Sequence, residues 1–435
     1  MTSTRAKTRT DEMSKERNKV LGKIHNKIQA EENRKTEEAL EVLENSKDDS
    51  TRMYKAVKQL KIQEPKKRIL VDGEDGQVTD EKEQVQIISD FFEKMFRSEE
   101  AEEMPKIPPQ EMKIPFTGEE VRKAVKSLKN NKSPGVDNLK AEMLKYGPSI
   151  LGEGIAEIYN DMAKTGEHPT EVIEGILIPL PKPGKKQGPP GHLRPIILLS
   201  ILRKILAICM IRRAAHKIYQ RIPNTQAAYR EGRSTTELIF AFKVLAEKAI
   251  SSKTYKILIL MLDMSKAFDT VKRAELFKDL REILDGDELH LLMIMLKDVE
   301  LQVRVGKETG RKIITNIGVP QGDSLSPLLF TLYLAQALKP KRVPTLEEHS
   351  YSLPPEELVP RNLMDHTYST PIEEELNIDQ QYADDISYLT DAPHIHEHHK
   401  STVPQTIKKR NLLVNNEKTE EYEISRTVMT GRNAD

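Results

Sequence analysis

Cysteine is nearly absent from this sequence: Cys209 is the single one among 435 residues. One thiol excludes an intramolecular disulfide and a cysteine-rich zinc finger or zinc knuckle. It also favours a reducing compartment, because structural disulfides are typical of oxidising ones. We therefore expect the protein in the nucleus, the cytoplasm or both.

Long hydrophobic runs are also missing. Residues 1–11 are polar and charged and lack the apolar core of a secretory signal. The longest apolar stretch, residues 196–211, is interrupted by Arg203 and Lys204 and falls short of the roughly 20 residues that span a membrane. The sequence therefore predicts no membrane partner, while its 37% hydrophobic content suffices for the cores of two or three domains.

Acidic residues are missing from one stretch. The chain as a whole has 68 basic and 68 acidic residues, so its net charge does not indicate a partner. Residues 175–230, however, contain no Asp or Glu and eleven basic residues: Lys182, Lys185, Lys186, Arg194, Arg203, Lys204, Arg212, Arg213, Lys217, Arg221 and Arg230. This clustering predicts a surface for a polyanion.

The N-terminal quarter of the chain divides by composition. Residues 1–60 alternate basic and acidic side chains with apolar ones at helical spacing, which predicts a charged helical arm or linker. Residues 61–115 predict a small segment with a short strand pair at 66–78 and an amphipathic helix after it. A Glu/Pro-rich break at 99–115 then suggests a domain boundary.

The main folded region is expected over 116–425. Its first helix has Thr117 as N-cap, with Glu120 placed to complete a capping box. Residues 339–377 are Pro-rich and polar with little periodicity, which predicts a surface insertion, and residues 426–435 are expected to form a tail.

Two adjacent carboxylates, Asp384 and Asp385, end the sequence Tyr-Ala-Asp-Asp at 382–385. The β-prone runs on either side predict a tight hairpin with both acids at its tip. Adjacent side chains of a strand point to opposite faces, so a hairpin tip is one of the few places where both can approach one ion. A solvated Asp-Asp turn is the alternative for an isolated pair.

A third carboxylate, Asp263, follows the continuous apolar run at 256–262. A buried strand that ends in an acid can aim it into a cleft, although Asp263 could equally cap the helix expected at 271–284. Further on, the Gly/Pro loop at 318–327 would let the backbone approach a ligand closely. Together with the hairpin, these elements can be assembled into one site.

Two polar clusters have ordinary explanations. The basic turn at 181–191 does not match a Walker phosphate loop, so Lys182 and Arg194 on either side of it could be plain loop charges. Four histidines, without cysteine nearby, are expected in a solvated loop rather than a metal site: His394, His396, His398 and His399.

Clustered carboxylates have a characteristic chemistry. They are hard oxygen ligands that suit Mg²⁺, and two ions about 4 Å apart would activate a 3′-hydroxyl and stabilise a leaving pyrophosphate. Carboxylates crowded without a cation would raise each other's pKa, so a bound cation is the natural resolution.

At least six segments, in the same order, resemble the reverse transcriptase of non-LTR (LINE-type) retrotransposons, and more distantly the group II intron and telomerase enzymes. Residues 131–137, 193–196 and 226–235 resemble fingers motifs. Residues 262–269 resemble motif A, 319–327 motif B, 382–385 motif C and 415–420 motif D. The resemblance implies an α+β right-hand polymerase: fingers and the start of the palm over 116–255, and an antiparallel palm sheet flanked by helices over 256–425.

The resemblance also implies roles for individual residues. Asp263, Asp384 and Asp385 match the catalytic metal ligands for two Mg²⁺ ions, which Mn²⁺ can replace. Phe268 matches the steric gate against a 2′-hydroxyl. Other matched positions are Arg194 and Lys182, which would clamp the triphosphate, Pro320, Gln321 and Gly322, which would pack on the nascent base pair, and Lys418, a proton donor to pyrophosphate.

The expected partners are an RNA template, a DNA primer and deoxynucleoside triphosphates, while the oligomeric state is not indicated. Neither the endonuclease domain nor the thumb of such elements is visible, so a catalytically inactive, nucleic-acid-binding remnant is the main alternative. An RNA-templated RNA polymerase is a second one, which Phe268 disfavours because such an enzyme must admit a 2′-hydroxyl.

Overall fold

The structure is a computed structural model that describes residues 30, 33–34, 36–38, 40–42, 69–73, 76–252, 255–339, 376–426 and 429–433. Most of the expected arm at 1–60 and of the expected insertion at 339–377 therefore lies outside the described residues. The chain forms two compact units, Met1–Arg68 and Ile69–Asp435. The described residues of the first unit are helical.

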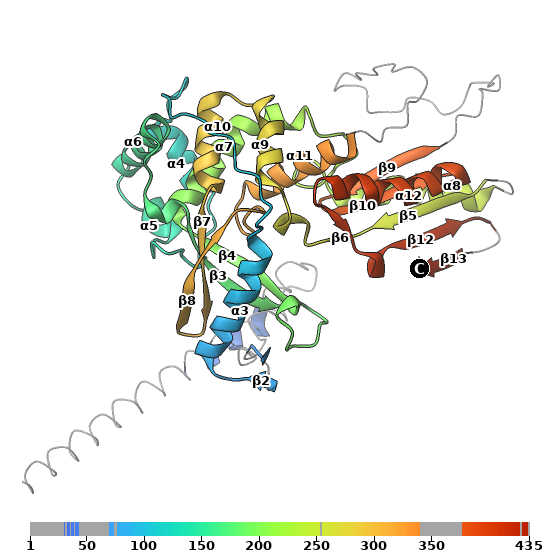
Figure 1. The fold of residues 1–435 in the computed structure, drawn as a ribbon, viewed down its shortest axis with the longest axis horizontal. Helices are drawn as coiled ribbons and strands as arrows, with labels where there is room; N and C mark the ends of the chain where they lie inside the picture. The colour runs from blue at the N-terminus through green and yellow to red at the C-terminus, as the bar shows by residue number, and fades with distance from the viewer. Residues whose placement is uncertain are drawn as a thin grey trace, which may run out of the picture. The chain divides into compact units, whose positions relative to one another are not determined.

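Among the described residues, eight antiparallel strand pairs, one parallel pair and a set of helices make the second unit an α+β fold (Figure 1). Its helices are α3 (Glu81–Phe96), α4 (Gly118–Ser127), α5 (Ala141–Lys145), α6 (Ile150–Thr165), α7 (Ile201–Tyr219), α8 (Thr235–Ser251), α9 (Arg273–Arg281), α10 (Gly286–Leu296), α11 (Ser326–Leu338) and α12 (Pro393–Lys409). Among the described residues, no helix combines the length and hydropathy needed to cross a bilayer.

The first large sheet has five antiparallel strands in the order β13-β12-β5-β10-β9. They are β13 (Met429–Asn433), β12 (Glu420–Ile424), β5 (Ile257–Leu262), β10 (Asp385–Thr390) and β9 (Asn377–Tyr382). The central position of β5 follows from its six consecutive apolar residues, since such a run can be buried on both faces. The residues expected to form a tail thus contribute the edge strand β13.

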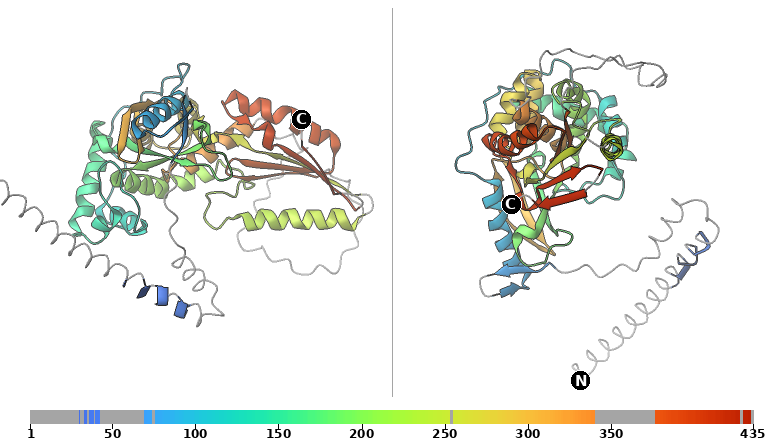
Figure 2. Two further views of the ribbon diagram at one scale, coloured as in Figure 1. Left: turned by 90° about the horizontal axis from the view of Figure 1, so that it is seen from below. Right: turned by 90° about the vertical axis from the view of Figure 1, so that its right-hand side faces the viewer.

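Helices cover both faces of this sheet, α12 on one side and α8 on the other (Figure 2). Alternate residues of β5 serve the two faces: Ile257 and Ile259 pack with α8, while Leu260 and Leu262 join the main core, to which α12 contributes. Burying each such side chain stabilises the fold by roughly 1.5–3 kcal/mol.

The second large sheet has the order β4-β3-β7-β8 and combines parallel and antiparallel pairs. Its strands are β3 (Glu174–Pro181), β4 (Leu193–Leu199), β7 (Val299–Val305) and β8 (Glu308–Thr315). The strand β7, from the part expected to form the palm, joins strands from the part expected to form fingers. Those two expected regions therefore share a sheet.

Helix α3 packs on this second sheet. Ile88, Phe92 and Phe96 lie at helical spacing and bury themselves among strand residues such as Leu177 and Val303. Together with the hairpin of β1 (Val71–Gly73) and β2 (Gly76–Val78), α3 belongs to the second unit. The two compact units divide at residue 68, and the boundary expected at 99–115 stays a prediction.

Two local expectations need correction. Thr117 accepts a hydrogen bond from the Glu120 amide, but the Glu120 carboxylate pairs with Arg213 at 2.6 Å, so only half of the capping box forms. The histidines expected in a solvated loop lie in α12, which buries His396 and His399. The strand pair expected within 66–78, the hairpin that carries the Asp-Asp pair and the strand at 256–262 are confirmed.

Candidate active site

Asp384 lies in the two-residue turn between β9 and β10, and Asp385 is the first residue of β10, where it pairs with Tyr382. Strand β10 also pairs with β5, with Ile386 opposite Leu262. Continuing that antiparallel register by one position sets Asp385 opposite Asp263. The sheet itself thus brings the two predicted sources of carboxylates together.

Asp263 is held by the segment that follows α12. Lys418 Nζ lies 3.2 Å from the Asp263 carboxylate, and Asn415 Nδ2 donates to it at 3.1 Å. The Asn415 amide also donates to the Asp263 carbonyl at 2.8 Å. Asp263 does not cap a helix, since α9 begins ten residues later at Arg273, with Lys272 as its N-cap.

The three carboxylates influence one another electrostatically. Burial raises the pKa of Asp384 above its ordinary value, and the charge of Asp263 adds to this shift. The pKa of Asp385 is raised by burial and by the charges of Asp384 and Asp263, while Lys418 opposes both shifts. Extra negative charge is therefore unfavourable here, which favours a cation.

The donor set fits a hard divalent ion in its chemistry, because it consists of three carboxylates whose mutual repulsion an ion would relieve. The described residues contain no group of three His, Cys, Asp or Glu side chains already arranged around a metal position. Lys418 and Asn415 contact the carboxylate of one member of this set, Asp263.

A cavity of about 520 Å³ lies beside the turn. All five predicted nucleotide-binding residues line it, together with Asp384: Lys182, Arg194, Phe268, Gln321 and Gly322. Asp263, Asp385 and Lys418 are not among its lining residues. Tyr229, Lys266 and Asp269, which the sequence did not single out, also line the cavity.

Phe268 and Asp269 belong to a short 3₁₀ turn, Ala267–Asp269. The Phe268 ring stacks on Phe330 with centroids 4.4 Å apart, which fixes it at the cavity wall. Asp269 accepts a hydrogen bond of 2.8 Å from Gln321 Nε2, and burial raises its pKa to about 6. A side-chain hydrogen bond therefore links the turn after β5 to the loop at 318–327.

Gly322 allows the same loop to approach β4. Its φ of +120° is one that residues with a side chain rarely adopt, and a Cβ there would lie 2.5 Å from the Ile197 carbonyl oxygen. Next to it, the Ile197 amide donates to the Gln321 carbonyl at 2.9 Å. The glycine is therefore required by backbone packing.

The acid-free stretch is only partly a free basic surface. Four of its cations are used inside the fold: Arg203 pairs with Asp323, Arg213 with Glu120, Lys217 with Asp285 and Glu288, and Arg230 donates to the carbonyls of Pro223 and Gln226. Lys182 donates to the Gly191 carbonyl, and burial beside Lys266 lowers its pKa. Lys185 and Lys186 remain exposed in the loop between β3 and β4.

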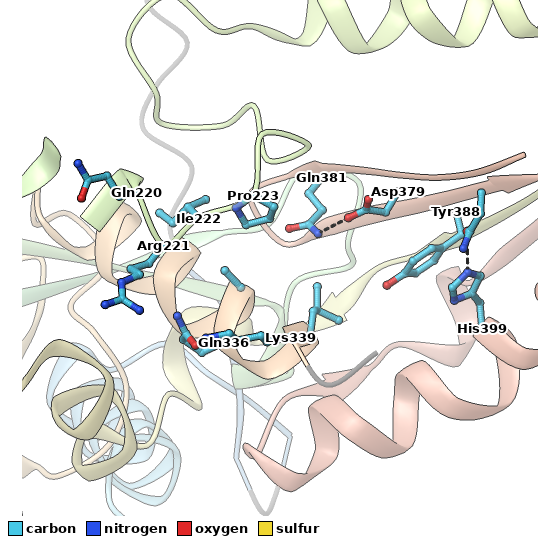
Figure 3. Close-up of a pocket in the computed structure, with 13 residues that line it drawn as sticks. Gln220, Arg221, Ile222, Pro223, Gln336, Lys339, Asp379, Gln381, Tyr388 and His399 are labelled. Atoms are coloured by element: carbon cyan, nitrogen blue, oxygen red, sulfur yellow. Dashed lines mark hydrogen bonds between the residues drawn. The ribbon is translucent and has the colours of Figure 1, made fainter. Parts of the chain in front are cut away.

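A second cavity, of about 570 Å³, lies under β9 and β10 (Figure 3). Its lining includes Asp379, Gln381, Tyr388 and His399 and none of the predicted site residues. His399 stacks on Tyr388, and His396 lies 3.2 Å from Glu421. His396 and His399 are therefore buried packing residues, while His394 and His398 lie on the exposed side of α12.

Comparison with known proteins supplies the family. The model described as "Reverse transcriptase (RNA-dependent DNA polymerase)" matches residues 180–429, which is more than half of the chain. A probable RNA-directed DNA polymerase from transposon BS of Drosophila melanogaster is 31% identical, covering 51% of this chain and 24% of its own length. The RNA-directed DNA polymerase from mobile element jockey of Drosophila funebris is 28% identical, covering 54% and 26%.

The chain thus spans about a quarter of the length of these relatives. Among solved structures, apo telomerase from Candida tropicalis matches with a TM-score of 0.40 and 13% identity, covering 57% of this chain and 44% of the telomerase chain. The family match extends over β4 to β12 and includes Asp263, Asp384 and Asp385. This chain belongs to the reverse transcriptase family.

Proposed function

We propose that this chain is the RNA-directed DNA polymerase part of a non-LTR retrotransposon protein. It would add deoxynucleotides to a DNA 3′ end on an RNA template. The observation that carries the proposal is the placement of Asp263, Asp384 and Asp385 at adjacent strand ends, beside a cavity lined by Lys182, Arg194, Phe268, Gln321 and Gly322.

In right-hand polymerase terms, we assign the five-stranded sheet with α8 and α12 to the palm. The β4-β3-β7-β8 sheet and the helices before α8 are assigned to the fingers, although β7 and β8 come later in the chain. The cavity between the turn after β5 and the strand β4 would then hold the incoming nucleotide.

Mg²⁺, bound by Asp263, Asp384 and Asp385, would supply the charge that activates the primer hydroxyl and stabilises the leaving pyrophosphate. Mn²⁺ would serve in its place. Lys182 and Arg194 carry the positive charge that binds a triphosphate. Lys418, whose Nζ lies 3.2 Å from the Asp263 carboxylate, would give a proton to pyrophosphate.

Selection of the sugar follows from Phe268. Its stacking on Phe330 leaves the ring little freedom to move away from a ribose 2′-hydroxyl. Gln321 and Gly322 would face the nascent base pair, with Gln321 oriented by Asp269. Contacts to RNA and DNA would be mainly to the backbone, through exposed cations such as Lys185 and Lys186.

The test is incorporation of labelled dTTP on poly(rA)/oligo(dT) with Mg²⁺. We expect activity in the wild-type chain, loss of at least 100-fold in Asp384→Ala, and little change in Asp161→Ala, an exposed carboxylate of α6 used as the control. The RNA polymerase alternative is tested by replacing dTTP with UTP in the same assay. The Phe268→Val variant should accept UTP better than the wild type. Absence of activity with salt-sensitive RNA binding retained would favour an inactive remnant.

A further inference from the structure

The turn that carries Asp384 and Asp385 contains a residue in an unusual conformation. Ala383 has a φ of +58°, in the left-handed region that residues other than glycine rarely adopt. It is buried, so its peptide groups need partners within the protein. What holds this peptide decides the directions in which the two neighbouring carboxylates project.

One side chain satisfies both peptide groups of Ala383. Gln226 accepts from the Ala383 amide at 3.0 Å through Oε1 and donates to the Ala383 carbonyl at 3.2 Å through Nε2. Its Oε1 also accepts from the Ala228 amide at 3.0 Å. Gln226 is only 1% exposed, so these are bonds that water does not replace.

The backbone around Gln226 adds to this contact. The Ala227 amide donates to the Gln381 carbonyl and the Gln381 amide to the Thr225 carbonyl, both at 3.0 Å. The segment thereby extends the edge of β9 by one bridge, next to the turn. Thr225 Oγ1 also donates to Asp379, which Gln381 contacts as well (Figure 3).

The segment that carries Gln226 is itself braced. Arg230 donates to the carbonyls of Pro223 and Gln226, and Arg233 donates to the carbonyl of Asn224 at 2.8 Å. Gln226 is therefore fixed in its own position before it contacts Ala383. It is not among the residues that line the 520 Å³ cavity, so it does not contact a nucleotide bound there.

We propose that Gln226 is a positioning residue for polymerisation, which sets the geometry of the Asp384–Asp385 turn through the peptide of Ala383. The expected effect of Gln226 on the polymerisation rate rests on the proposed function. Its expected effect on the turn rests on the hydrogen bonds alone. Replacing Gln226 leaves two buried peptide groups unpaired, and the turn relaxes from its strained conformation.

The first measurement is hydrogen exchange of the amides at 381–386, by mass spectrometry, without substrates. We expect the Ala383 amide to exchange at least 100-fold faster in Gln226→Ala than in the wild type. Gln226→Glu, which keeps the acceptor and loses the donor, should retain most of the protection. Gln220→Ala, an exposed glutamine at the end of α7, is the matched control. Unchanged exchange in Gln226→Ala would overturn the proposal.

The second measurement separates positioning from stability. Mn²⁺ binding, followed by electron paramagnetic resonance well below the melting temperature, should weaken about tenfold in Gln226→Ala. In the polymerase assay, kcat should fall while the KM for dTTP stays within twofold, because Gln226 does not line the nucleotide cavity. A lower melting temperature with unchanged Mn²⁺ affinity and kcat would mean a merely structural role and would refute the proposal.

Failure of the proposed function is recognised separately. If wild type and Asp384→Ala bind Mn²⁺ equally and neither incorporates dTTP, the assigned metal site is wrong. The exchange experiment then still decides whether Gln226 holds the turn.

Discussion

Arg203 Nε donates to Asp323 at 2.9 Å, and both side chains are fully or almost fully buried. Arg203 also donates to the Val172 carbonyl at 2.9 Å, while Asp323 accepts from the Leu325 amide. A helix of the basic stretch is thereby tied to the loop that carries Gln321 and Gly322. The pair holds in place the loop that forms one wall of the 520 Å³ cavity, which Asp323 also lines.

Breaking this buried pair should be costly. Arg203→Met leaves Asp323 buried without its cation, and we expect a loss of about 3–5 kcal/mol in the free energy of unfolding, measured with urea. Arg221→Met, an exposed arginine two residues after α7, should change stability by less than about 0.5 kcal/mol. The double variant Arg203→Met/Asp323→Leu should recover much of the loss, and full additivity of the two changes would contradict the coupling.

Asp269 predicts a pH effect on stability. Its pKa in the folded protein is about 6, above the ordinary 3.8, so the folded state holds this proton more tightly than the unfolded state. Stability from this group is therefore complete below pH 4 and is lost as pH rises through 6, by roughly 3 kcal/mol for two pKa units.

Asp269→Asn should remove that dependence, because an amide keeps an acceptor for Gln321 and does not ionise. The melting temperature of the variant minus that of the wild type should increase between pH 4 and 6.5 and be constant above. Asp161→Asn, on the exposed face of α6, is the control. If the melting temperatures of the wild type and Asp269→Asn change with pH in parallel, the pKa of Asp269 is not raised.

Lys418 should matter for catalysis and not for stability. Its side chain is 60% exposed, and exposed ion pairs contribute little, so Lys418→Met should shift the free energy of unfolding by less than about 1 kcal/mol. If Lys418 protonates pyrophosphate, the rate of dTTP incorporation should fall by about 10²-fold. Lys418→Arg keeps the charge but is a weak proton donor, so a wild-type rate in that variant would argue against the role.

Two glycines with positive φ offer a matched comparison. Gly322→Ala places a Cβ against the Ile197 carbonyl and should cost more than about 2 kcal/mol. Gly184→Ala, at φ +73° in the loop after β3, meets open space and should cost about 1 kcal/mol from backbone strain alone. Both losses are changes in the free energy of unfolding, measured with urea. Equal losses in the two variants would mean that the close approach of Gly322 to β4 adds nothing to the cost of the substitution.

The loop between β3 and β4 should contribute to RNA binding under the proposed function. Lys185→Glu/Lys186→Glu should weaken binding of a single-stranded RNA and reduce the slope of log affinity against log salt by about 1–2. Lys297→Glu, an exposed lysine after α10, is the charge-matched control for one substitution. If Lys297→Glu weakens RNA binding as strongly, the effect comes from the change in net charge and not from the loop between β3 and β4.

Structural features that depend on residues close together in the sequence were predicted well. The turn at 382–385, the strand that ends before Asp263 and the loop at 318–327 all follow from apolar runs bounded by Gly, Pro or Asp. The structure also brings Lys182, Arg194, Phe268, Gln321 and Gly322 to one cavity. Their individual roles remain predictions.

Partners distant in the chain escaped prediction. Gln226 lies 157 residues from Ala383, and Arg203 lies 120 from Asp323, so no local pattern marks either pair. A charged side chain is rarely buried unless it has a partner of opposite charge. Because the sequence does not show that Asp323 is this partner, Arg203 was expected on the surface.

The helix α12 was missed for a different reason. Four histidines and an internal proline, Pro404, suggest an irregular segment. The buried residues His396, His399, Val403 and Ile407 nevertheless recur at helical spacing, and this periodicity was the signal available.

The antiparallel pairing of β5 with both β10 and β12 bears on which insertions and deletions such a chain tolerates. Deleting one residue from β10 would shift its register with β5 and turn the side chains beyond it to the opposite face. Adding residues between α11 and β9 leaves the registers of the described strands unchanged, and lengthening a flexible connection costs only about 0.6 kcal/mol for each doubling of its length. Length variation among related chains is therefore expected between α11 and β9, with the strands themselves constant in length.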